Sequence, residues 1–234
     1  MSRLAKWLGI CAFVAVQIVL YFLFLAEDFG NADVGENAYI KYSTVCLAFL
    51  FAFCVYIITS LKGHRTNDGL LLALGLAFTL VSDLLLLVKV EFFEVGLVTF
   101  FGAQLCYFAR VERNKPWLIA SISLRTLLPT IGIIVLATLG EASALYILVV
   151  IYFVQLVANF VENVVCIFTA KGRAERVQAI VLAIGFLLFI GCDVCVGLTN
   201  LYGGMANELI WLFYTPSQVL IALSNRRIYE SEMD

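Results

Sequence analysis

Long apolar stretches separated by short polar segments form the main pattern along the chain. An α-helix needs about 20 apolar residues to cross the hydrocarbon core of a bilayer, and eight stretches of that order can be placed. They lie at 5–26, 42–61, 69–89, 93–110, 118–139, 143–169, 177–200 and 206–224. The pattern predicts an all-α integral membrane protein with eight transmembrane helices. Arg3 and Lys6 precede the first stretch as in a signal peptide, but it is too long and has no clear small-residue cleavage site, so we expect a retained helix.

The charged residues alternate in sign between the polar segments. Lys and Arg gather at both ends of the chain and after the second, fourth and sixth stretches, whereas the other segments are mostly acidic. The basic positions are Arg3, Lys6, Lys62, Arg65, Arg110, Arg113, Lys115, Lys171, Arg173, Arg176, Arg226 and Arg227. The acidic positions are Glu27, Asp28, Asp33, Glu36, Glu91, Glu94, Glu141 and Glu208. The positive-inside rule therefore places both termini and the basic segments in the cytoplasm.

Two segments in different halves of the chain carry matching glycine and aspartate residues. Gly75 and Asp83 in the third stretch have the same spacing as Gly185 and Asp193 in the seventh, and the offset is 110 residues. Because the offset covers an even number of helices, the halves would be related by an axis along the membrane normal. We expect one transmembrane domain, residues 1–234, made of two parallel four-helix repeats of about 1–112 and 113–234. Since glycine allows close helix approach, these glycines are expected to bring the third and seventh helices together.

Composition supports the membrane class and narrows the possible partners. Hydrophobic residues make up 63% of the chain and mean hydropathy is +1.00, more than a soluble domain usually shows. A net charge of −2 without a polybasic segment argues against a nucleic-acid partner. The seven cysteines lie within apolar stretches, where they behave as small hydrophobic residues. Cys192 and Cys195 form a CxxC around Asp193, but no second metal-ligating cluster accompanies it, so no metal or other cofactor is expected.

Asp83 and Asp193 are the first candidates for a functional site. Inserting a carboxylate at membrane depth costs about 2.5 to 3.5 kcal/mol of free energy on insertion scales. The presence of two such residues therefore suggests that both have a function. In one interpretation they pair with a buried donor, such as Arg125 or a Ser/Thr hydroxyl, and only tie helices together. In the other they face a water-accessible cavity in the outward half of the membrane, where one carboxyl donates a proton while the other stays charged. We favour the second interpretation.

Other polar residues within the apolar stretches also have two interpretations each. Tyr152, Gln155, Asn159 and Glu162 follow one helical stripe, which is expected to line a cavity or to form hydrogen bonds between helices. Lys41 begins the second helix, where it would anchor a phosphate, balance a carboxylate or lie at the interface. Arg125 is either a buried partner or the sign of a late start of the fifth helix. Three aromatic residues near helix ends are expected to be interface anchors: Tyr21, Trp117 and Trp211.

Several kinds of catalytic site are excluded by the residues present. His64 is the only histidine and lies in a predicted cytoplasmic segment, so neither a multi-histidine zinc site nor an intramembrane Ser-His-Asp triad can form. The chain also has no phosphate-binding Walker loop, dinucleotide fingerprint or HExxH motif.

Two blocks of sequence carry a family resemblance. In SDLLLL followed by FFEVGLVTFFGAQLCYFARV, Phe93, Gly96, Phe100 and Tyr107 fit a family pattern in which Gln104 replaces the usual His. In LLFIGCDVCVGL and FYTPSQVLIALS, the matching residues are Asp193, Tyr214 and Gln218. Lys41 stands where a Lys-Pro pair is common, with Tyr42 in place of the proline. With these features the chain resembles the YhhN family of membrane proteins, which includes the lysoplasmalogenases.

The resemblance implies an ether hydrolase that cleaves the vinyl ether bond of lysoplasmalogens, with a lysophospholipid substrate and the bilayer as its partners. Asp83 and Asp193 would be catalytic, one as acid and the other as base or stabiliser of an oxocarbenium-like centre. The residues expected at the substrate are Lys41, Glu94, Gln104, Tyr107, Asn159, Tyr214 and Gln218. The expected location is an endomembrane such as the endoplasmic reticulum, or the inner membrane of a bacterium. The alternatives are a non-enzymatic lipid-binding or proton-coupled transport protein and a purely structural membrane subunit.

Overall fold

The computed structural model describes residues 3–30, 38–63, 66–88, 90–111, 115–202 and 207–230, and no strand occurs within these ranges. The α-helices are α1 Arg3–Gly30, α2 Ala38–Leu61, α3 Asn67–Asp83, α4 Phe93–Arg110, α5 Lys115–Leu139, α6 Ala144–Thr169, α7 Arg173–Tyr202, α8 Asn207–Leu223 and α9 Arg227–Glu230. A π-helical turn, Leu84–Val88, and a 3-10 turn, Val90–Phe92, connect α3 to α4. The predictions for five loop residues lie outside the described residues: Asp33, Glu36, His64, Arg65 and Arg113.

Within the described ranges, six helices are long and apolar enough to cross a membrane, which identifies a multi-pass membrane protein. The qualifying segments are Leu4–Phe29, Ala38–Leu61, Asn67–Leu86, Pro116–Leu139, Ala144–Thr169 and Arg173–Asn200. Helix α8 contributes only a shorter apolar segment, Leu209–Leu223. Helix α4 is not among the six, and its 18 residues include Glu94, Gln104 and Arg110. The all-helical membrane fold is therefore confirmed, whereas the count of eight crossings stays a prediction.

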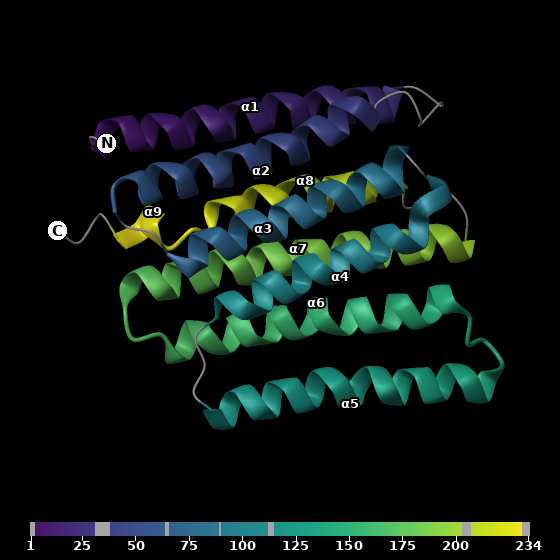
Figure 1. Cartoon of the computed structure of the whole chain (residues 1–234). Helices are drawn as coiled ribbons and strands as arrows, with labels where there is room; N and C mark the ends of the chain where they lie inside the picture. Colours follow the sequence, from purple (N-terminus) through teal and green to yellow (C-terminus); the bar gives the residue numbers. More distant parts are fainter. Residues whose placement is uncertain are drawn as a thin grey trace.

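The long helices run side by side as one bundle, with α1 and α5 on opposite flanks (Figure 1). Helix α1 packs on α2, α2 on α3 and α8, and α3 on α4. Helix α4 packs on α6, and α6 also packs on α5 and α7, which in turn contacts α8. The start of α1 and the short α9 lie at the same end of the bundle (Figure 1), where Lys6 Nζ donates a hydrogen bond to the Ile228 carbonyl. That this end is cytoplasmic stays a prediction.

Local sequence signals explain several helix boundaries. The Thr66 side chain accepts a hydrogen bond from the Gly69 amide and begins α3, and the Ser143 side chain accepts one from the Tyr146 amide and begins α6. Gly140 follows α5 with a φ of 77°, a left-handed conformation that glycine adopts without strain. These caps place the polar connections at the two ends of the bundle.

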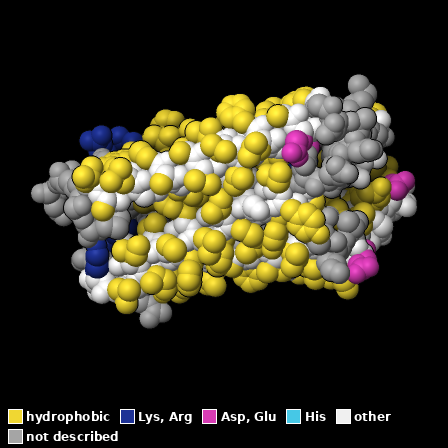
Figure 2. All heavy atoms as spheres, turned by 90° about the horizontal axis from the view of Figure 1, so that it is seen from above, with side chains coloured by type: hydrophobic (Ala, Val, Ile, Leu, Met, Phe, Trp, Pro, Cys, Tyr) yellow, Lys and Arg dark blue, Asp and Glu magenta, His cyan; other side chains and the backbone are white. Residues whose placement is uncertain are grey.

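The outer surface has the character expected of a lipid-facing protein. Large apolar side chains such as Phe22, Leu61 and Ile119 are exposed along the bundle. In the face shown by Figure 2, hydrophobic side chains cover the middle, basic side chains lie at one end and acidic ones lie at the other. This apolar band with charged ends matches a bilayer and its two interfaces.

Both predicted glycine contacts involve a different helix from the one expected. A Cβ added at Gly75 would lie 2.4 Å from Tyr107 Cε1 on α4, and one added at Gly185 would lie 3.2 Å from Ile221 Cγ1 on α8. The two glycines therefore allow α4 to pack closely against α3, and α8 to pack closely against α7. The prediction that they bring α3 and α7 together is wrong, because the glycine faces are filled by the next helix in each half.

Candidate active site

The first aspartate of the candidate site is held by a tyrosine from the other half of the chain. Asp83 is the last α-helical residue of α3 and is buried. The Tyr214 hydroxyl on α8 donates a hydrogen bond to its Oδ2 atom at 2.6 Å. Tyr214 is itself buried, so this donor reaches the carboxyl from within the bundle. The sequence grouped Tyr214 with the substrate contacts, and the structure places it directly on a predicted catalytic carboxyl.

The second aspartate has the same type of partner. Asp193 on α7 is partly buried, and the Tyr152 hydroxyl on α6 donates to its Oδ2 atom at 2.7 Å. Tyr152 belongs to the polar stripe of α6 that the sequence indicated. Because it donates to Asp193, this end of the stripe forms a hydrogen bond to α7. Neither aspartate hydrogen bond comes from Arg125 or from a Ser or Thr hydroxyl.

A series of aromatic rings connects the two aspartate–tyrosine pairs. Phe100 lies 5.7 Å from Tyr152 and 5.7 Å from Phe189, and Phe189 lies 5.4 Å from Tyr214, measured between ring centroids. Four helices, α3, α6, α7 and α8, thus bring two carboxyls and two phenols into one apolar region. In such a region fixed charges and dipoles act more strongly on one another than they do in water.

Lys41 lies next to this group, but it is buried and already paired. Its Nζ atom is 2.8 Å from Asp28 Oδ1, and the two side chains are only 4% and 2% exposed. The same ammonium lies 5.4 Å from the ring centroid of Trp211, and Trp211 makes an edge contact with Tyr214. Lys41 is therefore a carboxylate partner in this structure, and its predicted phosphate contact stays a prediction.

Asp28 was missed as a member of the site. The sequence assigned it to an acidic loop, whereas it lies in the last turn of α1. The buried positions Phe13, Gln17, Phe24 and Asp28 recur along one face of this helix, and that periodicity was the available signal. Trp211 is also buried in the bundle, so its interpretation as an interface anchor is wrong.

A second polar cluster lies between α5 and α6, around Arg125. Its guanidinium is 3.1 Å from Glu162 Oε2, and it donates to Gln155 Oε1 at 2.7 Å and to Asn159 Oδ1 at 2.8 Å. Ser121 also donates a hydrogen bond to Glu162. Because α5 begins at Lys115, the interpretation of Arg125 as a late helix start is wrong. The middle of the α6 stripe therefore forms hydrogen bonds between helices.

Gln104 and Asn159 belong to this second cluster instead of the aspartate group. The Asn159 amide donates to Gln104 Oε1 at 2.8 Å and to the Gln104 carbonyl at 3.0 Å. Gln104 is fully buried, and its Nε2 atom has no hydrogen-bond partner among the described residues. Asn159 lies seven residues from Tyr152 on α6, which is about 10 Å along a helix. Their substrate contacts stay predictions and would require a ligand that reaches this depth.

The remaining predicted contacts are spread over three places. Tyr107 is buried against Gly75, about two helical turns from Asp83, and its hydroxyl lies 3.4 Å from Thr79 Oγ1. Gln218 is buried one turn from Tyr214 and donates weakly to Ser217 Oγ at 3.4 Å. Glu94 is exposed in the first turn of α4. Of the predicted substrate contacts, Tyr214 is therefore the one whose hydrogen bond to Asp83 or Asp193 is seen among the described residues.

The two cysteines around Asp193 form no metal site, and one cavity lies apart from the aspartates. Cys192 and Cys195 are buried free thiols, and the described residues contain no cluster of His, Cys, Asp and Glu that would hold a metal ion. A cavity of about 440 Å³ lies at the end of the bundle where α3 and α7 begin. Asp83 lies 15 residues after Asp68, which lines the cavity. This separation is about 22 Å along α3, at about 1.5 Å per residue. A hydrated chamber shared by the two aspartates stays a prediction.

Comparison with known proteins gives one match. The sequence profile of the YhhN family matches residues 36–225. No curated protein and no solved structure matches the chain significantly. The matched region includes both aspartate–tyrosine pairs, Lys41 and the polar cluster of α5 and α6, whereas Asp28 lies outside it.

Proposed function

The chain belongs to the YhhN family, and on this premise we propose that it is a lysoplasmalogenase-like hydrolase of the membrane. The substrate is a lysoplasmalogen with an ethanolamine or choline head group. Its vinyl ether bond is cleaved to a fatty aldehyde and a glycerophospho-base. The single observation that carries the proposal is the placement of two carboxyls, each with one tyrosine donor, in a common apolar region of a family member.

The reaction is an acid-catalysed hydration followed by elimination. A protonated aspartate transfers its proton to the vinyl carbon remote from the ether oxygen, and the adjacent carbon becomes an oxocarbenium-like centre. Water adds to this carbon and gives up a proton to the second, ionised aspartate. In the resulting hemiacetal the hydroxyl gives its proton back to the first aspartate, and the second aspartate gives its proton to the glycerol oxygen as the carbon–oxygen bond breaks, which releases the aldehyde. One water is consumed and both carboxyls return to their starting states.

Two carboxyls in different protonation states are the usual requirement for this kind of step. Glycosidases also pass through an oxocarbenium-like state between two carboxyl groups, which is an analogy of mechanism and not of fold. In this chain the Tyr214 and Tyr152 hydroxyls would orient the two carboxyls. The aromatic rings between them would shield a developing cation from bulk water.

The membrane setting suits a single-chain lipid. Its hydrocarbon tail would lie among the apolar helix faces while the head group stays near the outward rim. The buried Lys41–Asp28 pair lies between that rim and Tyr214, joined through Trp211. Substrate contacts at Lys41, Glu94 and Gln218 belong to the same proposal. The location would be an endomembrane in a eukaryote or the inner membrane in a bacterium.

Aldehyde release from lysoplasmenyl-ethanolamine tests the proposal. The purified Asp83→Asn and Asp193→Asn variants are expected to lose at least about a hundredfold of the wild-type rate, the scale of general acid–base catalysis. Glu141→Gln removes an exposed carboxylate of a connecting loop and should retain the wild-type rate. Full activity in a normally folded Asp83→Asn or Asp193→Asn protein would refute the assigned roles.

A proton-coupled carrier is the second candidate, favoured by the buried Arg125–Glu162 cluster. Ionised groups in the middle of membrane bundles commonly mark ion or proton pathways, and Arg125 and Glu162 are both buried. In sealed proteoliposomes, a carrier would move substrate or protons without forming aldehyde. The hydrolase would form aldehyde in detergent, where no gradient exists.

A further inference from the structure

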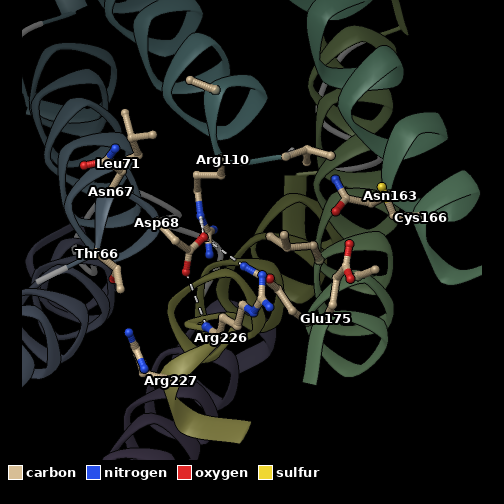
Figure 3. Close-up of a pocket in the computed structure, with 15 residues that line it drawn as sticks. Thr66, Asn67, Asp68, Leu71, Arg110, Asn163, Cys166, Glu175, Arg226 and Arg227 are labelled. Atoms are coloured by element: carbon tan, nitrogen blue, oxygen red, sulfur yellow. Dashed lines mark hydrogen bonds and ion pairs between the residues drawn. The ribbon is translucent and has the colours of Figure 1, made fainter. Parts of the chain in front are cut away.

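The proposed hydrolysis consumes one water molecule in each turnover, although both aspartates lie in an apolar region. A cavity of about 440 Å³ lies at the end of the bundle where α3 and α7 begin. This volume is large enough for several water molecules, each of which takes about 30 Å³ in the liquid. Asn163 of α6 lines the cavity, and Figure 3 shows it across from Asp68 and Leu71 of α3. Water in the cavity therefore meets a polar side chain of α6.

Two hydrogen bonds lead from Asn163 deeper into the bundle. Its Nδ2 atom donates to the Asn159 carbonyl at 2.8 Å, and the Asn159 amide nitrogen donates to Gln104 Oε1 at 2.8 Å. All three residues are buried. Along α6 this series runs from the cavity wall in the direction of Tyr152 and its partner Asp193, and it crosses to α4 at Gln104.

Gln104 ends this series with a hydrogen-bond donor that has no acceptor. Its side chain is fully buried, and its Nε2 atom has no hydrogen-bond partner among the described residues. An unsatisfied buried donor is unfavourable, and in folded proteins such groups commonly hold a buried water molecule. The Nε2 atom of Gln104 is therefore a favourable position for water in the interior of the bundle.

Beyond Gln104, two hydroxyl groups continue toward Asp83. Tyr107 follows Gln104 by three residues, so the two side chains share a face of α4. The Tyr107 hydroxyl lies 3.4 Å from Thr79 Oγ1 on α3, and both residues are buried. Thr79 precedes Asp83 by one helical turn, about 6 Å along α3. We propose that this row of polar side chains lines a path by which water passes from the cavity to Asp83.

This path would bring water and lipid to the aspartates from opposite ends of the bundle. The head group of the proposed substrate stays near the outward rim, whereas the cavity lies at the other end. Water would therefore reach the reaction without passing the bound lipid. The use of this water in hydrolysis rests on the proposed function, but the path itself can be detected without substrate.

Hydroxyl-radical footprinting of the full-length protein in detergent tests the path, because radicals formed from bound water oxidise the side chains beside it. In wild type, the Tyr107 ring should be oxidised although this residue is only 2% exposed. Gln104→Leu should lower the oxidation of Tyr107 about fivefold, the effect of losing one hydrogen bond to a buried water. Thr79→Val, which removes a hydroxyl and keeps the branched shape, is the second variant and should lower it too.

Gln17→Leu is the matched control. Gln17 is a buried glutamine of α1 whose Oε1 atom also has no partner among the described residues, and it lies outside the polar row. The oxidation of Tyr107 in this variant should equal that in wild type. The path is overturned if Tyr107 is not oxidised in wild type, or if Gln104→Leu and Thr79→Val both leave its oxidation unchanged. It is also overturned if Gln17→Leu lowers the oxidation as much as they do.

The aldehyde assay shows whether the path serves hydrolysis. Gln104→Leu should lower kcat about fivefold and leave KM unchanged, because it reduces the supply of water and not the binding of lipid. An unchanged kcat, or a raised KM alone, would overturn the supply of water to the reaction. Wild-type protein that releases no aldehyde would refute the proposed function alone, since the oxidation experiment contains no substrate.

Discussion

At the scale of single residues, each membrane aspartate depends on one phenolic hydroxyl. Tyr214 donates to Asp83 and Tyr152 donates to Asp193, at 2.6 and 2.7 Å. Replacing tyrosine by phenylalanine removes the donor and keeps the ring, including its contacts with Phe189 or Phe100. The contribution of the hydrogen bond can therefore be separated from that of packing.

We expect Tyr214→Phe and Tyr152→Phe each to lower kcat for aldehyde release by about 10- to 100-fold. A hydrogen bond to a charged group is worth about 1.5 to 3 kcal/mol, which corresponds to that range of rates. Steady-state kinetics with lysoplasmenyl-ethanolamine gives the measurement. Tyr146→Phe, at a tyrosine that is 46% exposed, should behave as wild type. Unchanged kcat in both aspartate-linked variants would show that the tyrosines serve only packing.

The Asp28–Lys41 pair supports a prediction about stability. Asp28→Asn leaves the buried Lys41 ammonium without its counter-charge, and breaking such a pair costs about 3 to 5 kcal/mol. Denaturant unfolding in detergent measures the loss. The neighbouring Glu27→Gln is the control, since Glu27 is exposed. Adding Lys41→Met to Asp28→Asn should restore most of the stability, and a double variant no more stable than Asp28→Asn would contradict the pairing.

At the scale of helices, the apolar stretches predicted the bounds of the helices closely, but they did not predict which helices contact one another. The predicted stretch 93–110 coincides with α4, while α1 extends to Gly30 and α5 begins at Lys115. The extension of α1 carries Asp28 into that helix, whereas Arg125 already lay within the predicted stretch 118–139, and both residues form buried ion pairs. Hydropathy underestimates the length of such helices, because a charged residue lowers the local average even when it has a partner in the folded protein.

The contact between α3 and α4 is sensitive to a single methyl group. In Gly75→Ala the new Cβ would lie 2.4 Å from Tyr107 Cε1. The Tyr107 ring is buried against Phe186, so it has little room to move. We expect a loss of about 1 to 3 kcal/mol in the free energy of unfolding, typical of overpacking. Gly9→Ala, where the added Cβ meets no atom within 4 Å, should leave the melting temperature unchanged or raise it, because alanine has the higher helix propensity. Equal melting temperatures for the two variants would exclude the close α3–α4 contact.

At the scale of the whole molecule, packing partners recur between the two halves. The contacts α1–α2, α2–α3 and α3–α4 correspond to α5–α6, α6–α7 and α7–α8, and α4–α6 corresponds to α8–α2. This is the pattern that a two-fold axis along the bundle would produce. The two four-helix repeats stay a prediction, which this pattern favours.

Tag accessibility tests the orientation and the number of crossings. We expect an N-terminal and a C-terminal epitope to be accessible only from the cytoplasmic side, as the positive-inside rule requires. An epitope inserted at Gly140, in the turn between α5 and α6, should be accessible from the opposite side. Protease protection in sealed vesicles gives the measurement. Termini on opposite sides of the membrane would rule out an even number of crossings.

The sequence by itself determined the class of the protein, its helices and the two aspartates that mark the candidate site. These properties are local, because hydropathy and charge are set by the residues of one segment whatever its neighbours are. The tertiary structure alone decided which polar groups meet: Tyr214 reaches Asp83 across 131 residues, and Arg125 bonds to Glu162 instead of an aspartate. Which partners meet depends on which faces of distant helices pack together. A helix-sized apolar stretch carries almost no information about that choice, because many of its faces are equally apolar.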